Sequence, residues 1–373
     1  MAQNWQDNGS NHSFTVIGLM SGTSLDGIDA ALIKTDGVQV FEHGPVCSTT
    51  YETEFRDKLR TCLGQQTASA DLIADFTRIQ SDIVQDLLAR NGLTPADINL
   101  IGFHGQTIFH DPANRITVQI GDGQLMADLT GIDTIAGFRV EDVAAGGEGA
   151  PFAPLYHQAL SRGLDGPLAV LNLGGVGNVT YIEGDTVLAF DTGPANALVD
   201  DWVLRHTGRT YDEDGRLAAT GTVNMQVLEQ LMDHPYFDIA PPKSLDRDQF
   251  PTAAVQGLSL EDGAATLLRF TSESIRKSLA HLPAPPKRWL LTGGGRKNPE
   301  LIRLISEAVA APVGPVEDVG WRGDDLEAEA FAFLAVRSLK GLPLSLPTTT
   351  GVPKPMTGGT LYAASSSRLS SAG

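Results

Sequence analysis

Cysteine and long apolar runs are both scarce in this sequence, and each absence excludes a class of protein. Only Cys47 and Cys62 occur among the 373 residues, too few for a disulfide framework, and no CxxC or Cys/His spacing indicates a zinc site. No apolar run reaches the roughly 18 residues that a membrane-spanning helix requires. The polar start of the chain lacks the basic-then-apolar order of a secretion signal. We therefore expect a reduced, soluble, cytoplasmic protein.

Basic residues are also few, because 27 Lys and Arg stand against 45 Asp and Glu and give a formal net charge of −18. Proteins that bind nucleic acids neutralise phosphates with basic patches, and no Lys/Arg cluster interrupts the acidity here. We expect neither a nucleic-acid nor a membrane partner. A small-molecule substrate accompanied by a divalent cation fits the charge better.

Apolar periodicity predicts two series of strands and helices in the same order. The first series consists of strands at 14–20, 28–34 and 38–46, a helix at 69–91, and strands at 98–104 and 115–120. The second consists of strands at 167–175, 178–184 and 186–190, helices near 193–206 and 261–282, a strand at 288–295, and helices at 298–309 and 324–339. The repeated order predicts two related α/β domains that face each other across a cleft.

The expected domain boundaries follow from this repeat. Domain I covers residues 14–150 and is joined by the C-terminal segment 340–362, and domain II covers 151–339. The irregular, proline-rich stretch 341–359 is predicted to cross back over the surface.

Small residues gather at four predicted strand ends, at 21–27, 171–178, 190–196 and 291–298. Each stretch alone can be a tight turn that needs positive φ. Four of them favour loops whose backbone N–H groups reach phosphate oxygens. None is a Walker A loop, and GGVGNV lacks the last glycine of GxGxxG. The segment GTSLD is a poor serine-hydrolase elbow, because Asp26 replaces the last glycine and a strand follows.

The first of these turns, SGTSLDG, carries Ser21, Thr23, Ser24 and Asp26 at the tip of a predicted β-hairpin. Hydroxyls and amides at such a tip can surround a terminal phosphate, and a carboxylate can hold Mg²⁺ through water. The alternative is an ordinary Asp-Gly turn, which would not need three hydroxyls.

Four other side chains are candidates for chemistry, each with a structural alternative. Asp191 follows a predicted strand and precedes a predicted helix, where it can act as a general base or cap the helix. His104 contacts a substrate or is a structural histidine. Arg139 suits a carboxylate because its planar fork matches that group, or is an unspecific surface residue. Glu327 is by default a solvated helix residue.

With these motifs, the sequence closely resembles the anhydro-N-acetylmuramic acid kinases, sugar kinases of the hexokinase/Hsp70/actin superfamily. The resemblance runs from about Phe14 to Tyr362. It rests on GLMSGTSLDGID, GFHGQTIFH, VQIGDG, FRVEDVAAGGEGAP, LNLGGVGN, FDTGPANALVDDW and TGGGRKN. Two positions depart from the family pattern: Gly137, where Asp is usual, and Glu148, where Gln is common. The resemblance implies an α/β, two-domain ribonuclease H-like (actin/hexokinase-like) fold with a central nucleotide cleft.

The resemblance also implies an activity. The enzyme would use ATP and Mg²⁺, open the anhydro bridge of 1,6-anhydro-N-acetylmuramic acid with water, and phosphorylate O6. The products would be N-acetylmuramic acid 6-phosphate and ADP, in cell-wall recycling, and the enzyme would be a homodimer. Two alternatives stay open: a kinase of plain 1,6-anhydroglucose (levoglucosan), and a non-catalytic actin-like ATP-binding module. A serine hydrolase is the weakest alternative.

Roles carry over from the family to matching positions of this chain. Asp191 matches the catalytic carboxylate. The expected nucleotide contacts are Gly22, Thr23, Ser24, Leu25, Asp26, Gly27, Ile28, Asp29, Gly174, Gly175, Gly293, Gly294 and Gly295. The expected sugar contacts are His104, Gln106, Arg139, Gly193 and Asn196. Asp26 and Glu327 are the expected Mg²⁺ ligands.

Overall fold

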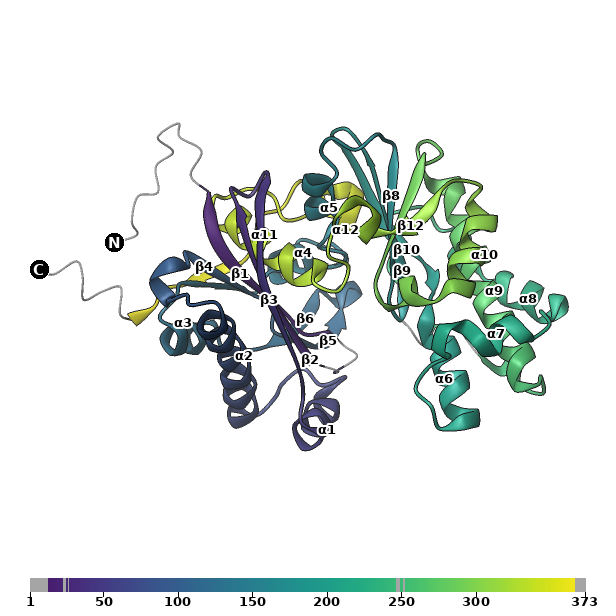
Figure 1. The fold of residues 1–373 in the computed structure, drawn as a ribbon, viewed down its shortest axis with the longest axis horizontal. Coiled ribbons are helices and arrows are strands. Elements are labelled where there is room, and N and C mark those ends of the chain that lie inside the picture. The colour runs from purple at the N-terminus through teal and green to yellow at the C-terminus, as the bar shows by residue number, and fades with distance from the viewer. Residues whose placement is uncertain (1–12, 23–24, 26, 246–248, 251, 366–373) are drawn as a thin grey trace, which may run out of the picture. The chain divides into compact units, whose positions relative to one another are not determined.

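The computed structural model describes residues 13–365, except 23–24, 26, 246–248 and 251 (Figure 1). The chain divides into two compact units. Unit 1 holds the described residues up to Ala145, the stretch Glu327–Leu344, and those from Met356 onward. Unit 2 holds Gly146–Leu326 and Ser345–Pro355.

Unit 1 contains a six-stranded sheet in the order β13-β7-β4-β1-β2-β3. Strands β1, β2 and β3 are antiparallel neighbours. Strands β4 and β7 run parallel to β1, and β13 pairs with β7 in the antiparallel direction at the edge of the sheet. The strands are β1 (Phe14–Met20), β2 (Gly27–Thr35), β3 (Val40–Thr50), β4 (Leu100–Phe103), β7 (Thr134–Ala136) and β13 (Thr360–Tyr362). A separate hairpin pairs β5 (Gln106–Asp111) with β6 (Ile116–Ile120).

Both faces of this sheet are covered, which explains the nearly continuous apolar run of β1. Successive side chains of a strand point to opposite faces. Ile17 and Leu19 therefore share a core with Phe76 of α2 (Ala70–Arg90), while Gly18 faces the other way. The helices of unit 1 are α1 (Thr53–Cys62), α2, α3 (Gly123–Thr130), α4 (Val140–Ala144) and α11 (Leu326–Leu339, whose first residue falls in unit 2).

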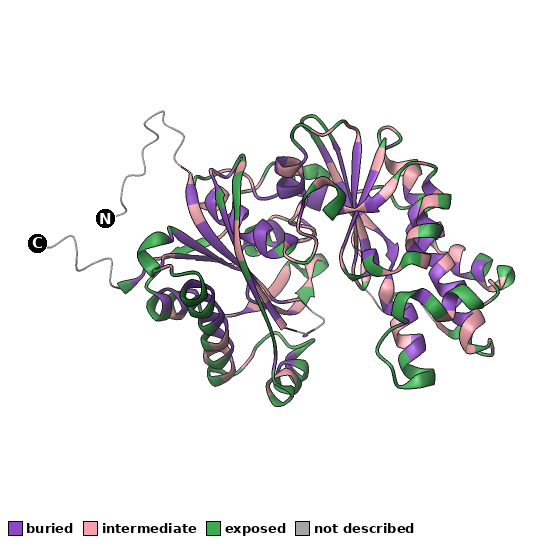
Figure 2. Cartoon of the chain, in the orientation of Figure 1, coloured by how far each residue is buried: buried purple, intermediate pink, exposed green. Residues whose placement is uncertain are grey.

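Unit 2 contains a five-stranded sheet in the order β10-β9-β8-β11-β12. Its strands are β8 (Leu168–Leu173), β9 (Val176–Glu183), β10 (Thr186–Pro194), β11 (Arg288–Thr292) and β12 (Val313–Pro315). Its helices are α5 (Pro154–Leu160), α6 (Asn196–Thr207), α7 (Arg216–Thr220), α8 (Met225–Met232), α9 (Leu260–Ser278), α10 (Pro299–Val309) and α12 (Pro347–Thr350). Figure 2 shows the central strands buried and the helices exposed on one side.

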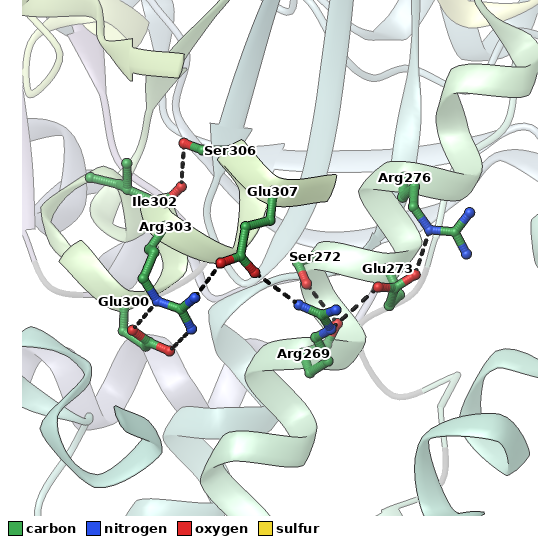
Figure 3. A network of polar contacts seen from close by, with 9 residues as sticks. All are labelled: Arg269, Ser272, Glu273, Arg276, Glu300, Ile302, Arg303, Ser306 and Glu307. Atoms are coloured by element: carbon green, nitrogen blue, oxygen red, sulfur yellow. Dashed lines mark hydrogen bonds and ion pairs between the residues drawn. The ribbon is translucent and has the colours of Figure 1, made fainter. Parts of the chain in front are cut away.

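The apolar interior holds α9 and α10 together in unit 2. Leu267 and Leu268 of α9 and Leu301 of α10 are almost fully buried in one cluster. On the exposed side, Arg269 of α9 pairs with Glu307 of α10, which also pairs with Arg303 on its own helix (Figure 3). Ion pairs at such exposed positions contribute about 0–1 kcal/mol each, so they add little to the packing.

The two sheets share one topology. In each, three consecutive antiparallel strands are followed by two strands that run parallel to the first, giving β3-β2-β1-β4-β7 and β10-β9-β8-β11-β12. This is the strand order of a ribonuclease H-like unit, present twice. The predicted fold class, two such α/β units of the actin/hexokinase type, is confirmed.

The position of α11 corrects the expected domain boundaries. Residues 151–339 are expected in domain II, but the structure places Glu327–Leu344 in unit 1 and Ser345–Pro355 in unit 2. The reason lies in two paired strand glycines, Gly18 and Gly102, which have no side chains to hold α11 away. A Cβ on Gly18 would lie 1.8 Å from the Ala328 carbonyl oxygen, and one on Gly102 would lie 2.2 Å from that of Phe331.

Several short elements were not predicted, among them α1, α3, α5, α7, α8, β5, β12 and β13. Most span eight residues or fewer, too short to show a clear period. Within the described ranges, no helix is long and apolar enough to cross a membrane.

We expect Gly18→Ala to destabilise unit 1 strongly, because the added methyl would collide with backbone atoms of α11 that cannot move aside. Overpacking of this kind costs about 1–3 kcal/mol or more, measured as a lower thermal unfolding midpoint. Gly166→Ala is the matched control, since its Cβ would lie 3.7 Å from the Ile182 carbonyl oxygen, an ordinary contact distance. Equal midpoints for the two variants would contradict the close approach of α11.

Candidate active site

Hydrogen bonds from Gln106, the first residue of β5, hold the turn between β1 and β2. The buried Ser21 hydroxyl donates to Gln106 Oε1 at 2.7 Å, and Gln106 Nε2 donates to the Gly22 carbonyl at 3.2 Å. Leu25 closes the turn with its N–H on the Gly22 carbonyl and has a φ of +56°. Thr23, Ser24 and Asp26 lie outside the described residues. Ser21 and Gln106 thus support the turn, and a sugar contact by Gln106 would require these bonds to change.

The other nucleotide-turn residues of unit 1 belong to strand β2. Gly27 pairs with Thr50 on β3, and a Cβ at this position would lie 2.1 Å from the Thr49 carbonyl oxygen. Ile28 is buried, and Asp29 pairs with Met20 on β1. The β1–β2 hairpin predicted from the sequence is therefore present, and Gly27 is the first residue of its second strand.

His104 and Arg139 form a pair in unit 1. Arg139 Nε donates to His104 Nε2 at 3.0 Å, so this ring nitrogen carries no proton. Burial and the charge of Arg139 hold the pKa of His104 well below its usual range. Burial lowers the pKa of Arg139 to about 10, although the nearby negative charges of Glu327 and Asp142 raise it. His104 therefore positions the guanidinium. The His104 ring packs against Phe331 with centroids 4.4 Å apart, and Arg139 Cζ lies 5.8 Å from the centre of the same ring.

Glu327 comes to lie beside Arg139, in the first turn of α11. Within the part of the chain that the structure describes, no group of three or more His, Cys, Asp or Glu side chains could hold a metal. Mg²⁺ that binds with a nucleotide is usually held by one or two carboxylates together with phosphates and waters, so the expected site does not require such a group. The expected roles of Asp26 and Glu327 as ligands stay predictions.

Asp191 lies inside β10, not after it as expected, at a point where the pairing with β9 is irregular. Its Oδ2 accepts a hydrogen bond of 2.8 Å from the N–H of Leu245, and its own N–H donates to the Lys243 carbonyl. Tyr236 donates its hydroxyl proton to the carbonyl of Asp191 at 2.6 Å. The helix-cap alternative is excluded, because α6 begins only at Asn196 with Ala195 at its cap position.

The electrostatic surroundings make Asp191 a candidate base. Burial raises the pKa of Asp191 to about 7, and the charge of Glu148 adds to this effect. The Leu245 N–H and the charge of Lys243 act in the opposite direction. A group that titrates near neutral pH exists in the ionised form and still accepts a proton readily, as a general base must.

The residues around Asp191 were not predicted from the sequence. Lys243 donates from Nζ to the Tyr236 carbonyl and lies 4.4 Å from the centre of that ring, and burial lowers its pKa to about 8. Ser244 donates to Glu148 Oε2 at 2.5 Å. These residues lie in loops without periodicity, and the only sequence signal was the adjacent prolines before Lys243, which exclude regular structure.

Three glycine turns of unit 2 come together around the start of α6. The carbonyls of Gly174 and Gly175 accept from the N–H groups of Asn196 and Ala195, at 2.9 and 3.0 Å. The Asn196 amide donates to the Leu173 carbonyl, and a Cβ on Gly295 would lie 3.0 Å from Asn196 Oδ1. Asn196 therefore connects the turns, which is a structural role beside the sugar contact expected of it.

Close packing explains why two more of the expected site positions are occupied by glycine. Gly293 has a φ of +75°, and a Cβ there would lie 2.4 Å from Asn172 Oδ1. Gly193 has a φ of +151°, and its Cβ would lie 2.6 Å from Ser274 Oγ on α9. Around Gly294, by contrast, an added Cβ would meet no atom of the described residues within 4 Å apart from its chain neighbours, so this residue faces open space.

Arg296 anchors the third glycine turn. This nearly buried side chain donates from Nη1 to the Gly293 carbonyl at 3.0 Å and from Nη2 to Glu317 at 2.9 Å. Its Nη2 also lies 3.0 Å from Asp324 Oδ1. The pair of acids fixes the guanidinium, which in turn fixes the carbonyl of Gly293.

Comparison with known proteins places this geometry in a family. The family described as anhydro-N-acetylmuramic acid kinase matches residues 14–364, nearly the whole chain. The chain belongs to this family. It is therefore a kinase, as the resemblance predicted.

Two relatives illustrate the family. The anhydro-N-acetylmuramic acid kinase of Paramagnetospirillum magneticum is 55% identical, over 92% of this chain and 98% of its own length. That of Rhodospirillum rubrum is 52% identical, over 93% and 94%. Among solved structures, a ligand-bound xylulose kinase from Lactobacillus acidophilus is similar over 96% of this chain and 95% of its own. Its identity is 12% and its TM-score 0.45, too distant to bear on substrate or mechanism.

The raised pKa of Asp191 predicts how the stability of this anhydro-N-acetylmuramic acid kinase family member depends on pH. Its carboxyl moves from a usual pKa of 3.8 to about 7 on folding, so the folded state favours the protonated form. The resulting penalty is absent below pH 4 and grows as the pH rises to 7. Asp191→Asn removes it and is expected to be more stable than the wild type by about 2–4 kcal/mol above pH 8.

Thermal unfolding at pH 5 and pH 8.5 checks this difference. The exposed Asp185 on the β9–β10 turn offers the matched control, because Asp185→Asn changes no buried charge. A lower unfolding midpoint for Asp191→Asn than for the wild type at pH 8.5 would contradict the assignment.

Proposed function

We propose that the chain uses ATP to phosphorylate 1,6-anhydro-N-acetylmuramic acid while water opens its anhydro bridge, giving N-acetylmuramic acid 6-phosphate and ADP. The observation that carries the proposal is the state of Asp191 in a chain of this kinase family. This carboxyl is partly buried, held by the Leu245 N–H, and has a pKa of about 7. A base poised in this way is what the attack of water on the anomeric carbon requires.

The proposed mechanism uses one carboxylate. Opening a glycosidic bond normally takes two carboxyl groups, one to activate water and one to protonate the departing oxygen. In the anhydro sugar the departing oxygen is O6, which is also the atom that becomes phosphorylated. If the γ-phosphoryl group captures O6 as the bridge opens, no separate acid is needed.

Bonds and electrons balance in this scheme. Asp191 takes a proton from water, whose oxygen forms a bond to C1. The electron pair of the C1–O6 bond moves to O6, which forms a bond to the γ-phosphorus. The bond between the γ-phosphorus and the bridging oxygen of ATP breaks, and ADP leaves. Positioning and charge neutralisation by the glycine turns provide the rest.

The turns at Gly22–Asp29, Gly174–Gly175 and Gly293–Gly295 are the proposed phosphate contacts. The open space at Gly294 and the fixed carbonyl of Gly293 support this for the third turn. Mg²⁺ bound with ATP would supply positive charge against the phosphates. A homodimer is the proposed assembly, which light scattering of the purified protein would check.

The main test measures ADP release from purified protein with ATP and the anhydro-muramic sugar, followed by mass analysis of the product. We expect sugar-dependent ADP release, and ¹⁸O from labelled water on the anomeric hydroxyl when the product is analysed at once. Asp191→Asn should lose ring opening and phosphoryl transfer together, by about 10²–10⁴-fold. Release of unphosphorylated open sugar by this variant would show that the two steps are not coupled.

The same assay separates the alternatives. Faster turnover of 1,6-anhydroglucose than of the muramic sugar would favour a levoglucosan kinase. Tight ATP binding without sugar-stimulated turnover would indicate a non-catalytic module.

Arg139 is proposed to read the lactyl carboxylate of the substrate, because His104 fixes the Nε edge of its guanidinium. We expect Arg139→Ala to raise KM for the muramic sugar by about 10–100-fold, the size of a lost charge-assisted hydrogen bond. A 1,6-anhydro sugar without the acid serves as the internal control and should lose little. Equal losses for both sugars would rule out this assignment.

A further inference from the structure

The loop segment from Lys243 to Leu245 binds two carboxylates at once. The carbonyl of Lys243 and the N–H of Leu245 hold the backbone and the Oδ2 of Asp191. Between them, Ser244 donates its hydroxyl proton to Glu148 Oε2 at 2.5 Å. The two donors belong to adjacent residues, so Asp191 and Glu148 are bound to one segment, where the charge of Glu148 acts on Asp191. All of these residues belong to unit 2.

Among the residues that the structure describes, the charged and titratable groups that act on Asp191 come from three places. Glu148 lies in the loop before α5, Lys243 in the binding segment, and Tyr236 in the short helix Pro235–Asp238. The charges of Asp191 and Glu148, together with burial, raise the pKa of the Tyr236 phenol, which stays a donor. Asp238 acts on Lys243, whose pKa it raises against the effect of burial.

These groups have opposite effects on the pKa of Asp191. The Leu245 N–H and the cation of Lys243 stabilise the ionised carboxylate and weaken it as a base, whereas the anion of Glu148 does the reverse. Lys243 directs its Nζ to the Tyr236 carbonyl, so its charge is shared with another acceptor. Ser244 keeps Glu148 in place, because a charge-assisted bond to a hydroxyl is among the strong hydrogen bonds.

We propose that Glu148 is a positioning residue for the general base: anchored by Ser244, it keeps a second negative charge beside Asp191 and strengthens that residue's hold on the proton of the attacking water. This inference rests on the proposed role of Asp191. A stronger base lowers the barrier for removing that proton, so Glu148 acts on the rate of ring opening through Asp191 without touching the sugar.

Glu148→Gln tests the proposal, because glutamine keeps an oxygen that accepts from Ser244 and removes only the charge. The pH profile of kcat/KM is expected to keep its shape, with the acidic limb displaced to lower pH by about one unit. The plateau of kcat is expected to fall about 3–10-fold, with KM little changed, since Asp191 becomes a weaker base. Glu229→Gln, on the exposed face of α8, is the matched control and should follow the wild type.

Lys243→Met provides the opposite arm. Removing the cation should move the acidic limb to higher pH, so the two variants bracket the wild type. If Glu148 and Lys243 had only structural roles, both variants would lose activity, but the acidic limbs of their kcat/KM profiles would not move in opposite directions.

A direct titration separates this inference from the proposed function. In protein labelled with ¹³C at the aspartate carboxyls, the signal absent from Asp191→Asn reports the titration of Asp191. Its midpoint should be lower in Glu148→Gln, whether or not the enzyme turns over the sugar. An unchanged midpoint would overturn the inference, as would a lowered midpoint with an unmoved kinetic limb. Absence of turnover in the wild type would instead refute the proposed function alone.

Discussion

A carboxylate on a largely buried strand must be paired with a cation or give up part of its charge, and Asp191 does neither fully. Among the described residues, the cation that acts on it, Lys243, donates to the Tyr236 carbonyl, and the donor to its Oδ2 is the neutral N–H of Leu245. Complete pairing would make a stable but weak base. Complete burial without donors would keep the carboxyl protonated at neutral pH. The pKa of about 7 lies between these limits, and Asp191 reaches the Leu245 N–H from a point of β10 where the register with β9 shifts.

In unit 1, polar side chains act mainly on other protein groups. Gln106 holds Ser21 and Gly22, and His104 holds Arg139, although the sequence suggested that both would contact a ligand. Such residues fix the geometry of the turn and of the guanidinium that are proposed to bind ligands. A rigid support of this kind is what allows a turn and a guanidinium to bind a ligand without large losses of conformational entropy.

The sequence predicted those parts of the fold that carry a local signal. Central strands such as β1 and β8 are buried on both faces and read as apolar runs, and long helices such as α2 and α9 show their period over several turns. The unit to which α11 belongs could not be predicted in this way, because an apolar stripe along a helix shows that one face is buried but not which sheet covers it. Motifs singled out Asp191 and the glycine turns as candidates. Glu148 was noted only as a departure from the family pattern, and Ser244 and Lys243 were missed, because only tertiary structure brings these loop residues together.

The paired glycines of β1 and β4 also affect the order in which the two units can fold during synthesis. The face of the first sheet that carries Gly18 and Gly102 is covered by a helix that begins at residue 326, so it stays bare while unit 2 is synthesised. At ribosomal speeds of about 5–20 residues per second, that interval lasts on the order of ten seconds or more. Unit 2, nearly continuous in the chain, has all but one short segment of its residues available by then. The amino-terminal unit is therefore finished last, and until then its uncovered sheet is a surface for chaperones to shield.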